Sequence, residues 1–128
     1  NESKSSFGVL RGLHYQDKPY LQAKLVRVVQ GEIQDVAVDI RKESKTYLKY
    51  VSVILSEKNM KQMYIPRGFA HGFLVLSDTA IVCYKIDNLF KQDLYRGIRY
   101  DDPQIGINWK LEKDKLKLSE KDKHNPFI

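Results

Sequence analysis

Apolar and polar residues alternate with a period of two through most of this chain, and this pattern constrains its fold more than any other feature. Successive side chains of a strand point to opposite faces, so the period predicts β-strands with one buried face. The predicted strands are 23–30, 33–40, 47–55, 64–68 (ending in a Pro–Gly turn), 71–76 and 79–86. Short strands at regular spacing are typical of an antiparallel sandwich or barrel, so we expect an all-β chain.

The residues between these segments predict how the chain turns. Gly31-Glu32 predicts a tight hairpin between the first two strands, and Ser77-Asp78 predicts a second hairpin between the last two. Residues 58–63 are expected to be a polar connection, 101–106 a loop, and the C-terminal end to hold one helical turn. The chain has no internal repeat and no linker, and 128 residues suffice for one core. We expect a single domain over 1–128.

The charge balance raises nucleic acid and anionic membranes as partners, because 22 basic and 16 acidic side chains leave a net charge of +6. The charges are spread along the chain, however, and the densest stretch, 110–123, alternates in sign. That alternation predicts a solvated C-terminal tail over 110–128. No apolar run approaches the roughly 18 residues that span a bilayer. We therefore expect neither nucleic acid nor membrane as a partner, and a small anionic ligand such as a nucleotide remains open.

The single cysteine, Cys83, excludes an internal disulfide and favours a reducing cytoplasm. Because it lies in an apolar strand, we expect its side chain to be buried. The first residues are polar and lack the apolar stretch of a signal peptide. The chain starts at Asn1 instead of Met, so we expect its N-terminal part to be missing.

A few polar side chains share rows with apolar ones and should face inward. Lys24, Asp35 and Tyr84 each alternate with residues expected in the core. A small barrel that points such groups inward either satisfies them mutually or uses them on a ligand. Taken singly, a Lys in a strand most often reaches solvent and a Tyr usually packs its ring. A structural role and a ligand-binding role therefore both stay open for these residues.

The segment around His14 gives two further expectations. Strict alternation places Arg11 and His14 on opposite faces unless Gly12 carries a β-bulge. Metal-dependent barrels need two His side chains two residues apart, and neither His14 nor His71 has such a neighbour. We therefore expect no bound metal. The chain also lacks a glycine-rich phosphate loop and a Ser-His-Asp elbow.

Several blocks together make the chain recognisable over its whole length. They are GVLRGLHYQ at 8–16, KLVR at 24–27, GE at 31–32, DVAVDIR at 35–41, IP at 65–66, GFAHGFLVLS at 68–77, YK at 84–85, DDP at 101–103, IGINW at 105–109 and LSEKD at 118–122. In this order they resemble the dTDP-4-dehydrorhamnose 3,5-epimerase family, metal-free nucleotide-sugar epimerases of the cupin fold.

The resemblance implies a cupin-type antiparallel barrel, or jelly roll, and an isomerase. Its activity would be epimerisation of a dTDP-4-keto-6-deoxyhexose at C3 and/or C5, in deoxysugar biosynthesis of the dTDP-L-rhamnose type. The resemblance also implies an enzyme that needs no cofactor, and, together with the exposed edges of short sheets, it implies a homodimer. Two alternatives remain: a non-catalytic cupin that binds a sugar or nucleotide, and a mono-epimerase or ketoisomerase on a related nucleotide sugar.

The resemblance assigns roles residue by residue. His14 matches the catalytic base and Asp122 the carboxylate that orients it. Lys24 matches the cation facing the sugar O4, and Tyr84 the acid on the opposite face of the ring. The positions that line the substrate site in relatives are Arg11, Gln16, Asp35 and His71.

The chain also departs from the family pattern. It lacks the first few dozen residues, which in relatives carry a segment that helps to bind the nucleotide. Two explanations stay open: a longer N-terminus was removed, or the chain is a shortened homologue with altered nucleotide binding. In addition, Leu89 stands where relatives carry an aromatic residue beside the sugar, and Tyr95 stands where they carry Glu.

Overall fold

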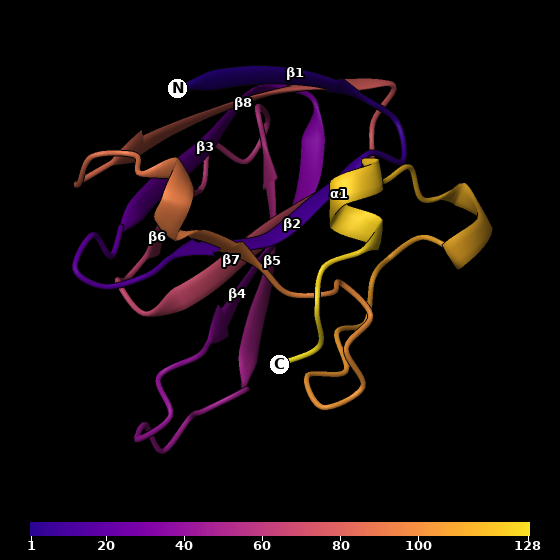
Figure 1. Cartoon of the computed structure of the whole chain (residues 1–128). Helices are drawn as coiled ribbons and strands as arrows, with labels where there is room; N and C mark the ends of the chain where they lie inside the picture. Colours follow the sequence, from indigo (N-terminus) through magenta and orange to yellow (C-terminus); the bar gives the residue numbers. More distant parts are fainter.

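The computed structural model describes residues 1–128 and contains two antiparallel sheets (Figure 1). The first sheet has the strand order β1 (Glu2–Ser6), β8 (Thr79–Ile86), β3 (Lys24–Gln30) and β6 (Gln62–Ile65). The second has the order β5 (Tyr50–Ser56), β4 (Glu32–Asp39), β7 (Phe69–Val75), β2 (Leu10–Gln16) and β9 (Tyr95–Gly97). The helical elements are the short η1 (Gln92–Leu94), η2 (Lys113–Lys115) and α1 (Glu120–Lys123). The predicted all-β architecture and the C-terminal helical turn are confirmed.

The two sheets pack face to face around one apolar core. In β3, Val26 and Val28 are buried while Leu25 and Arg27 are exposed, as a period of two requires. The core joins this row to side chains of the opposite sheet, and its members include Ile33, Leu55, Phe73, Val75, Ala80 and Val82. The inward rows of both sheets therefore meet in one interior. None of the helical elements has the length and apolar character needed to cross a membrane.

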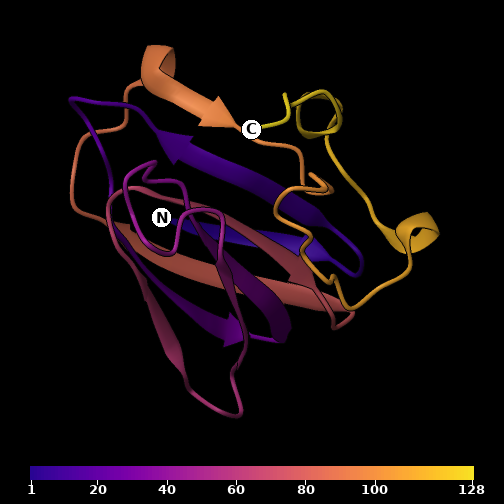
Figure 2. The same cartoon turned by 90° about the horizontal axis from the view of Figure 1, so that it is seen from below.

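The C-terminal residues cover the outer face of the second sheet. In the view from below, this yellow segment lies to one side of the strands (Figure 2). Leu116 and Leu118 pack against Leu10 and Leu74 on that outer face. Ile98 and Ile105 pack against Val36 and Val38 of β4, so β4 is buried on both faces. The prediction of a solvated tail is therefore wrong for Leu116 and Leu118. The charged side chains of 110–117 are exposed to solvent, while the leucines between and after them pack onto the sheet.

Both predicted hairpins are wrong, because their strands belong to different sheets. β3 pairs with β6 and β8, whereas β4 pairs with β5 and β7. Gly31 has φ +87°, and a Cβ at this position would collide with the carbonyl oxygen of Thr79. The two turns thus pack against each other where the chain crosses between the sheets. A turn sequence predicts that the chain reverses but does not say which strand it will pair with.

Three further boundaries differ from the prediction. β5 begins at Tyr50, since the preceding residues form a turn in which Leu48 has φ +66°. β6 begins inside the expected polar connection, because the Met63 side chain is buried in the core. The Cys83 side chain lies on the outward row of β8 and is only half-buried, with its thiol donating to the Glu2 carboxylate (3.4 Å). The prediction of a buried Cys83 is therefore wrong.

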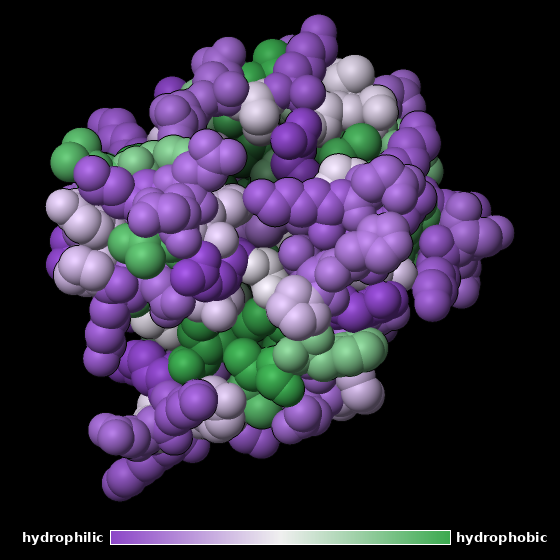
Figure 3. Space-filling view, in the orientation of Figure 1, coloured by the Kyte–Doolittle hydropathy of each residue, from purple (hydrophilic) through white to green (hydrophobic).

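The outside of the molecule is mostly hydrophilic. Figure 3 shows one face, on which a hydrophobic area lies below the centre. The large apolar side chains that are exposed come from many elements: Phe7, Leu25, Val29, Val51, Met60, Tyr64, Leu89, Phe90 and Phe127. Leu25, Val29 and Tyr64 share the outward face of the first sheet.

Candidate active site

A β-bulge in β2 sets the direction of the site side chains. Arg11 lies opposite Phe73 and His14 lies opposite His71, so three steps along β2 match two steps along β7. The extra residue places Arg11 and His14 on one face, the inward face that also carries Phe73. Gly12, at the bulge, has φ +126°. The structure thus contains the bulge on which the common placement of Arg11 and His14 depended.

Replacing Gly12 by Ala is expected to destabilise the fold by about 2–4 kcal/mol, because this site combines backbone strain with a collision. A Cβ at Gly12 would lie 2.7 Å from the Gly72 Cα and 2.8 Å from the His71 carbonyl oxygen. Urea unfolding measures the loss. Gly106→Ala is the matched control, since Gly106 also has a positive φ (+66°) but its surroundings are open. Equal losses in the two variants would contradict the proposed collision.

The bulge brings His14 to Asp122. The His14 Nε2 lies 2.7 Å from Asp122 Oδ1, and the Gly12 N–H donates to Asp122 Oδ2 (3.1 Å). The Asn125 amide donates to Oδ1 (3.2 Å), and Asp122 is only 4% exposed. Burial alone would raise the pKa of Asp122, but the hydrogen bond and charge of His14, with the other two donors, lower that pKa below its usual value. Asp122 is therefore a buried carboxylate held by three donors, one of which is the His14 ring.

The α1 turn presents Asp122 to β2. Ser119 caps this turn, its hydroxyl accepting from the Asp122 N–H (3.1 Å). Figure 1 shows α1 beside β2, although the two are far apart in sequence. Charge alternation in 110–123 gives no sign of a buried acid, so the position of Asp122 follows from tertiary packing.

Lys24 and Tyr84 enter the interior from the opposite sheet. Tyr84 pairs with Val26 across β8 and β3, and Lys24 lies on the same inward row as Val26. The Lys24 Nζ lies 6.0 Å from the centroid of the Tyr84 ring. Burial lowers the pKa of Lys24 to about 8, and the nearby Asp35 carboxylate opposes that shift. Lys24 is therefore a cation at neutral pH that can lose its proton a little above it.

Asp35 and His71 form a second buried pair. The His71 Nε2 lies 2.6 Å from Asp35 Oδ1, and the two side chains come from adjacent strands of the second sheet. Asp35 is 0% exposed, and its Oδ2 has no hydrogen-bond partner within the protein. A buried acceptor without a donor costs about 1–3 kcal/mol, so this oxygen is available to a donor from a ligand.

The two remaining predicted residues differ in what they offer a ligand. Arg11 is exposed, and its guanidinium donates to the Ser5 hydroxyl (3.1 and 3.3 Å). Gln16 is buried, and its amide nitrogen donates to the carbonyls of Tyr20 (2.6 Å) and Leu89 (2.8 Å), while its oxygen accepts from the Lys91 N–H (2.8 Å). Gln16 thus connects two loops, whereas the other predicted residues present polar groups to the interior or its mouth.

Tyr95 is a site residue whose place in the interior the sequence patterns did not predict. Its ring lies 5.1 Å from the His14 ring, and β9 pairs with β2 at this point. Burial raises the pKa of the Tyr95 phenol above its usual range; Tyr84 and Asp122 raise it further, while Arg11 lowers it. Because β9 has only three residues, a period of two could not identify it as a strand.

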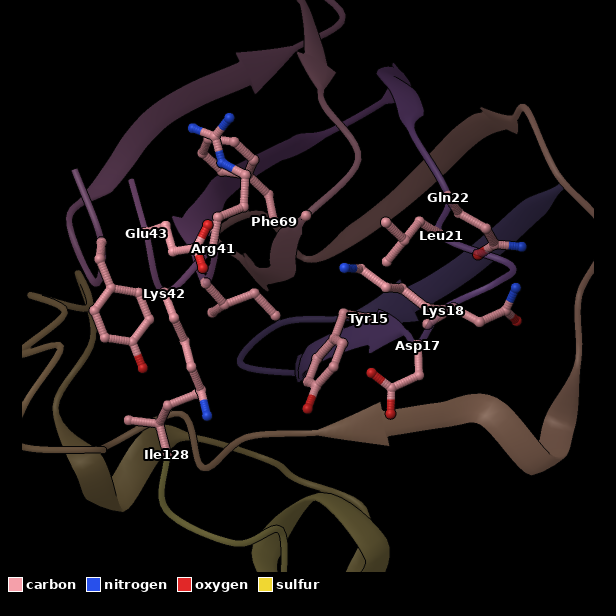
Figure 4. A pocket seen from close by; sticks show the side chains of 14 residues that line it. Tyr15, Asp17, Lys18, Leu21, Gln22, Arg41, Lys42, Glu43, Phe69 and Ile128 are labelled. Atoms are coloured by element: carbon pink, nitrogen blue, oxygen red, sulfur yellow. The ribbon is translucent and has the colours of Figure 1, made fainter. Parts of the chain in front are cut away.

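Two cavities differ in the chemistry of their linings. A cavity of about 430 Å³ is lined by Arg11, His14, Tyr95, Lys121 and Asp122, among others. Another, of about 630 Å³, lies between 15–22 and 40–43 (Figure 4). In the second, Arg41 is paired with Asp39 (2.9 Å) and Asp17 with Arg96 (3.3 Å). His14 and Asp122 therefore line the first cavity and not the second. No group of three or more His, Cys, Asp or Glu side chains is arranged to hold a metal ion.

Comparison with known proteins identifies the family to which this chain is similar. The family model described as dTDP-4-dehydrorhamnose 3,5-epimerase matches residues 1–128. The dTDP-4-dehydrorhamnose 3,5-epimerase of Methanothermobacter thermautotrophicus is 56% identical over 126 residues, which are 97% of this chain and 67% of the relative.

Solved structures of relatives have the same fold. The dTDP-4-dehydrorhamnose 3,5-epimerase of Elizabethkingia anophelis superposes with a TM-score of 0.99 at 47% identity, covering 100% of this chain and 70% of that one. The dTDP-6-deoxy-D-glucose-3,5-epimerase of Legionella pneumophila, solved in complex with dTDP-4-keto-L-rhamnose, gives 0.95 at 48% identity, covering 99% and 66%. The cupin-type barrel expected from the sequence is confirmed, and the chain spans about two thirds of the length of these relatives. The chain therefore belongs to the dTDP-4-dehydrorhamnose 3,5-epimerase family, a family of isomerases.

Proposed function

We propose that this protein epimerises a dTDP-4-keto-6-deoxyhexose at C3 and/or C5, by removing a proton from a carbon next to the ketone. The observation that carries the proposal is the placement of His14, paired with Asp122 of α1, on one sheet and of Lys24 and Tyr84 on the opposite sheet. Groups on opposed sheets can act on the two faces of a sugar ring held between them. The Legionella pneumophila relative, solved with dTDP-4-keto-L-rhamnose, supports this substrate class.

In the first step, His14 takes the proton. Because Asp122 accepts from the Nε2–H of His14, we assign the free lone pair to Nδ1, which is therefore the basic nitrogen. The electrons of the broken C–H bond form a C=C bond, and the C4 carbonyl becomes an enolate oxygen. The imidazolium that results is stabilised by the Asp122 carboxylate at 2.7 Å.

Lys24 is assigned to the enolate oxygen. Its ammonium is held in a half-buried position from which it can face the sugar O4, where negative charge develops. Asp35 Oδ2, buried without a partner, can accept a hydrogen bond from a sugar hydroxyl. A hydroxyl donor would thus be bound tightly, and a substrate lacking it would leave this oxygen unsatisfied.

Tyr84 is assigned the return of a proton to the other face of the same carbon. The phenol O–H is broken, a new C–H bond forms from the enolate, and the C4 carbonyl is restored. The phenolate and the His14 imidazolium then return to their first states by proton exchange with solvent. The configuration at carbon is inverted without net uptake or loss of protons.

Deuterium incorporation measured by NMR tests this function. The protein is mixed with dTDP-4-keto-6-deoxyglucose in D₂O, and label at a carbon flanking the ketone is the expected result. Label at both C3 and C5 would indicate a 3,5-epimerase, and label at one of them a mono-epimerase. Saturable binding without label at either carbon would overturn the proposed reaction and favour a non-catalytic nucleotide-sugar-binding cupin.

We further propose that the protein is a cytoplasmic homodimer. The outward face of the first sheet carries the exposed apolar side chains of Leu25, Val29 and Tyr64, which supports association of two copies. The free thiol of Cys83 is compatible with a reducing compartment. Sedimentation equilibrium at micromolar concentration should give about twice the chain mass of 15.0 kDa. A species of 15.0 kDa alone would contradict the dimer.

A further inference from the structure

The Tyr95 ring forms a wall of the His14 site. The two ring centroids lie 5.1 Å apart, with the planes tilted by 41°. The bond to Cβ and the hydrogen bond at Nε2 fix two points of the imidazole, but the plane of the ring can still tilt about the line that joins them. An aromatic surface packed against the imidazole removes this freedom, so Asp122 and Tyr95 together can determine the orientation of His14.

Tyr95 is itself held from several sides. Phe90 meets the Tyr95 ring edge-on at 5.3 Å, and the Lys121 Nζ lies 5.5 Å from its centroid. Its backbone pairs with Gln16 in β2, two residues from His14. Lys121 is the neighbour of Asp122 in α1, so the element that orients His14 also contacts Tyr95.

The phenol adds no charge beside the base. Burial raises the pKa of Tyr95 above its usual range, and the nearby Tyr84 and Asp122 act in the same direction, so the group stays neutral while His14 works. A neutral ring can pack against the imidazole in both of its protonation states.

We propose that Tyr95 is a positioning residue for the His14 base, a proposal that rests on the proposed function. Its ring, not its hydroxyl, restricts the orientation of the imidazole. Nothing in the assigned proton transfers uses Tyr95. It acts through His14, by restricting the imidazole to the orientation in which Asp122 accepts from Nε2.

Steady-state kinetics on three variants test the proposal. Tyr95→Leu removes the aromatic wall and is expected to lower kcat by about 10²-fold, with KM changed by less than about threefold, because orientation acts on the chemical step. Tyr95→Phe keeps the ring and should restore kcat to within about threefold of the unaltered protein. Phe127→Leu is the matched control, since Phe127 is 59% exposed, packs on the Arg99 guanidinium and does not line the His14 cavity, and its kcat should not change.

A spectroscopic measurement makes the test independent of turnover. An aromatic ring at 5.1 Å shifts the His14 ring-proton resonances, which His14→Gln identifies by their loss. We expect these resonances to move in Tyr95→Leu and to keep their positions in Tyr95→Phe and Phe127→Leu. If Tyr95→Leu does not fold, Tyr95→Met, which is closer to Tyr in length, replaces it in both measurements.

The outcomes separate this proposal from the proposed function. The unaltered protein could fail to incorporate deuterium while the resonances shift as expected. That result would overturn the epimerase function but would leave the Tyr95–His14 contact established. With the unaltered protein active, an unchanged kcat in Tyr95→Leu would overturn the positioning role. A loss in Tyr95→Phe as large as in Tyr95→Leu would also overturn it, because the hydroxyl would then be the active group.

Discussion

Replacing His14 by Gln should lower the rate of deuterium incorporation at the substrate carbons by about 10²–10⁴-fold, the usual contribution of a positioned general base. Gln keeps a polar side chain of similar reach but cannot accept the proton from carbon. The bulge at Gly12 places no other imidazole on this row of β2, and the remaining inward imidazole, His71, is paired with Asp35 at 2.6 Å. No neighbouring group is therefore in a position to replace the lost base.

The measurement is the initial rate of label uptake by NMR, with nucleotide-sugar binding followed in parallel. His124→Gln is the matched control, since His124 is exposed at the end of α1 and its Nδ1 lies 2.7 Å from the Glu120 carbonyl oxygen. Asp122→Asn should also slow uptake, because an amide cannot support the imidazolium as a carboxylate does. If His14→Gln keeps the rate of His124→Gln, His14 is not the base.

Replacing Lys24 by Met should lower kcat by about 10²–10³-fold, as the removal of one preorganised donor to a developing oxyanion does. Met retains much of the length and apolar surface of the Lys stem, so the packing beside Tyr84 is largely kept. Lys85→Met is the control, because Lys85 lies next to Tyr84 in β8 but on the outward, exposed row. Equal rates in the two variants would contradict the assignment of Lys24 to the enolate oxygen.

The pH dependence provides a second test of Lys24. Burial lowers the pKa of this amine to about 8, so it is charged below that pH and becomes neutral above it. We therefore expect kcat to fall as pH rises through about 8. In Lys24→Arg the guanidinium stays charged, and the alkaline fall should move to higher pH. An alkaline limb at the same pH in both proteins would assign it to another group.

The strand pattern predicted the architecture well because it reports burial directly. The segment 79–86 coincides with β8, and the rows that place Lys24 and Tyr84 inward agree with the structure. The same pattern failed at the connections: Gly31 and Ser77 lie at crossings between sheets, not in hairpins. Local residues determine a turn, whereas the choice of partner strand depends on the packing of the whole core.

For the candidate site, the sequence supplied the chemical groups but little of their arrangement. Period two could place Asp35 inward, but it could not show that His71 lies 2.6 Å from it on the next strand. Arg11 and His14 could share a face only through a bulge, which alternation cannot predict. Asp122 and Tyr95 come from segments with no informative period, and only their packing against β2 brings them to His14.

The sequence by itself determined that this chain forms antiparallel strands, which side chains of β3, β4 and β8 face inward, and which family it resembles. These properties depend on the alternation of residues within a strand and on the order of motifs along the chain. The tertiary structure alone decided which strands pair, where the bulge falls, and how Asp122 and Tyr95 reach His14. Those features arise from contacts between residues that are distant in the sequence, such as those of His14 with Tyr95 and Asp122, and such contacts leave no local signal in the sequence.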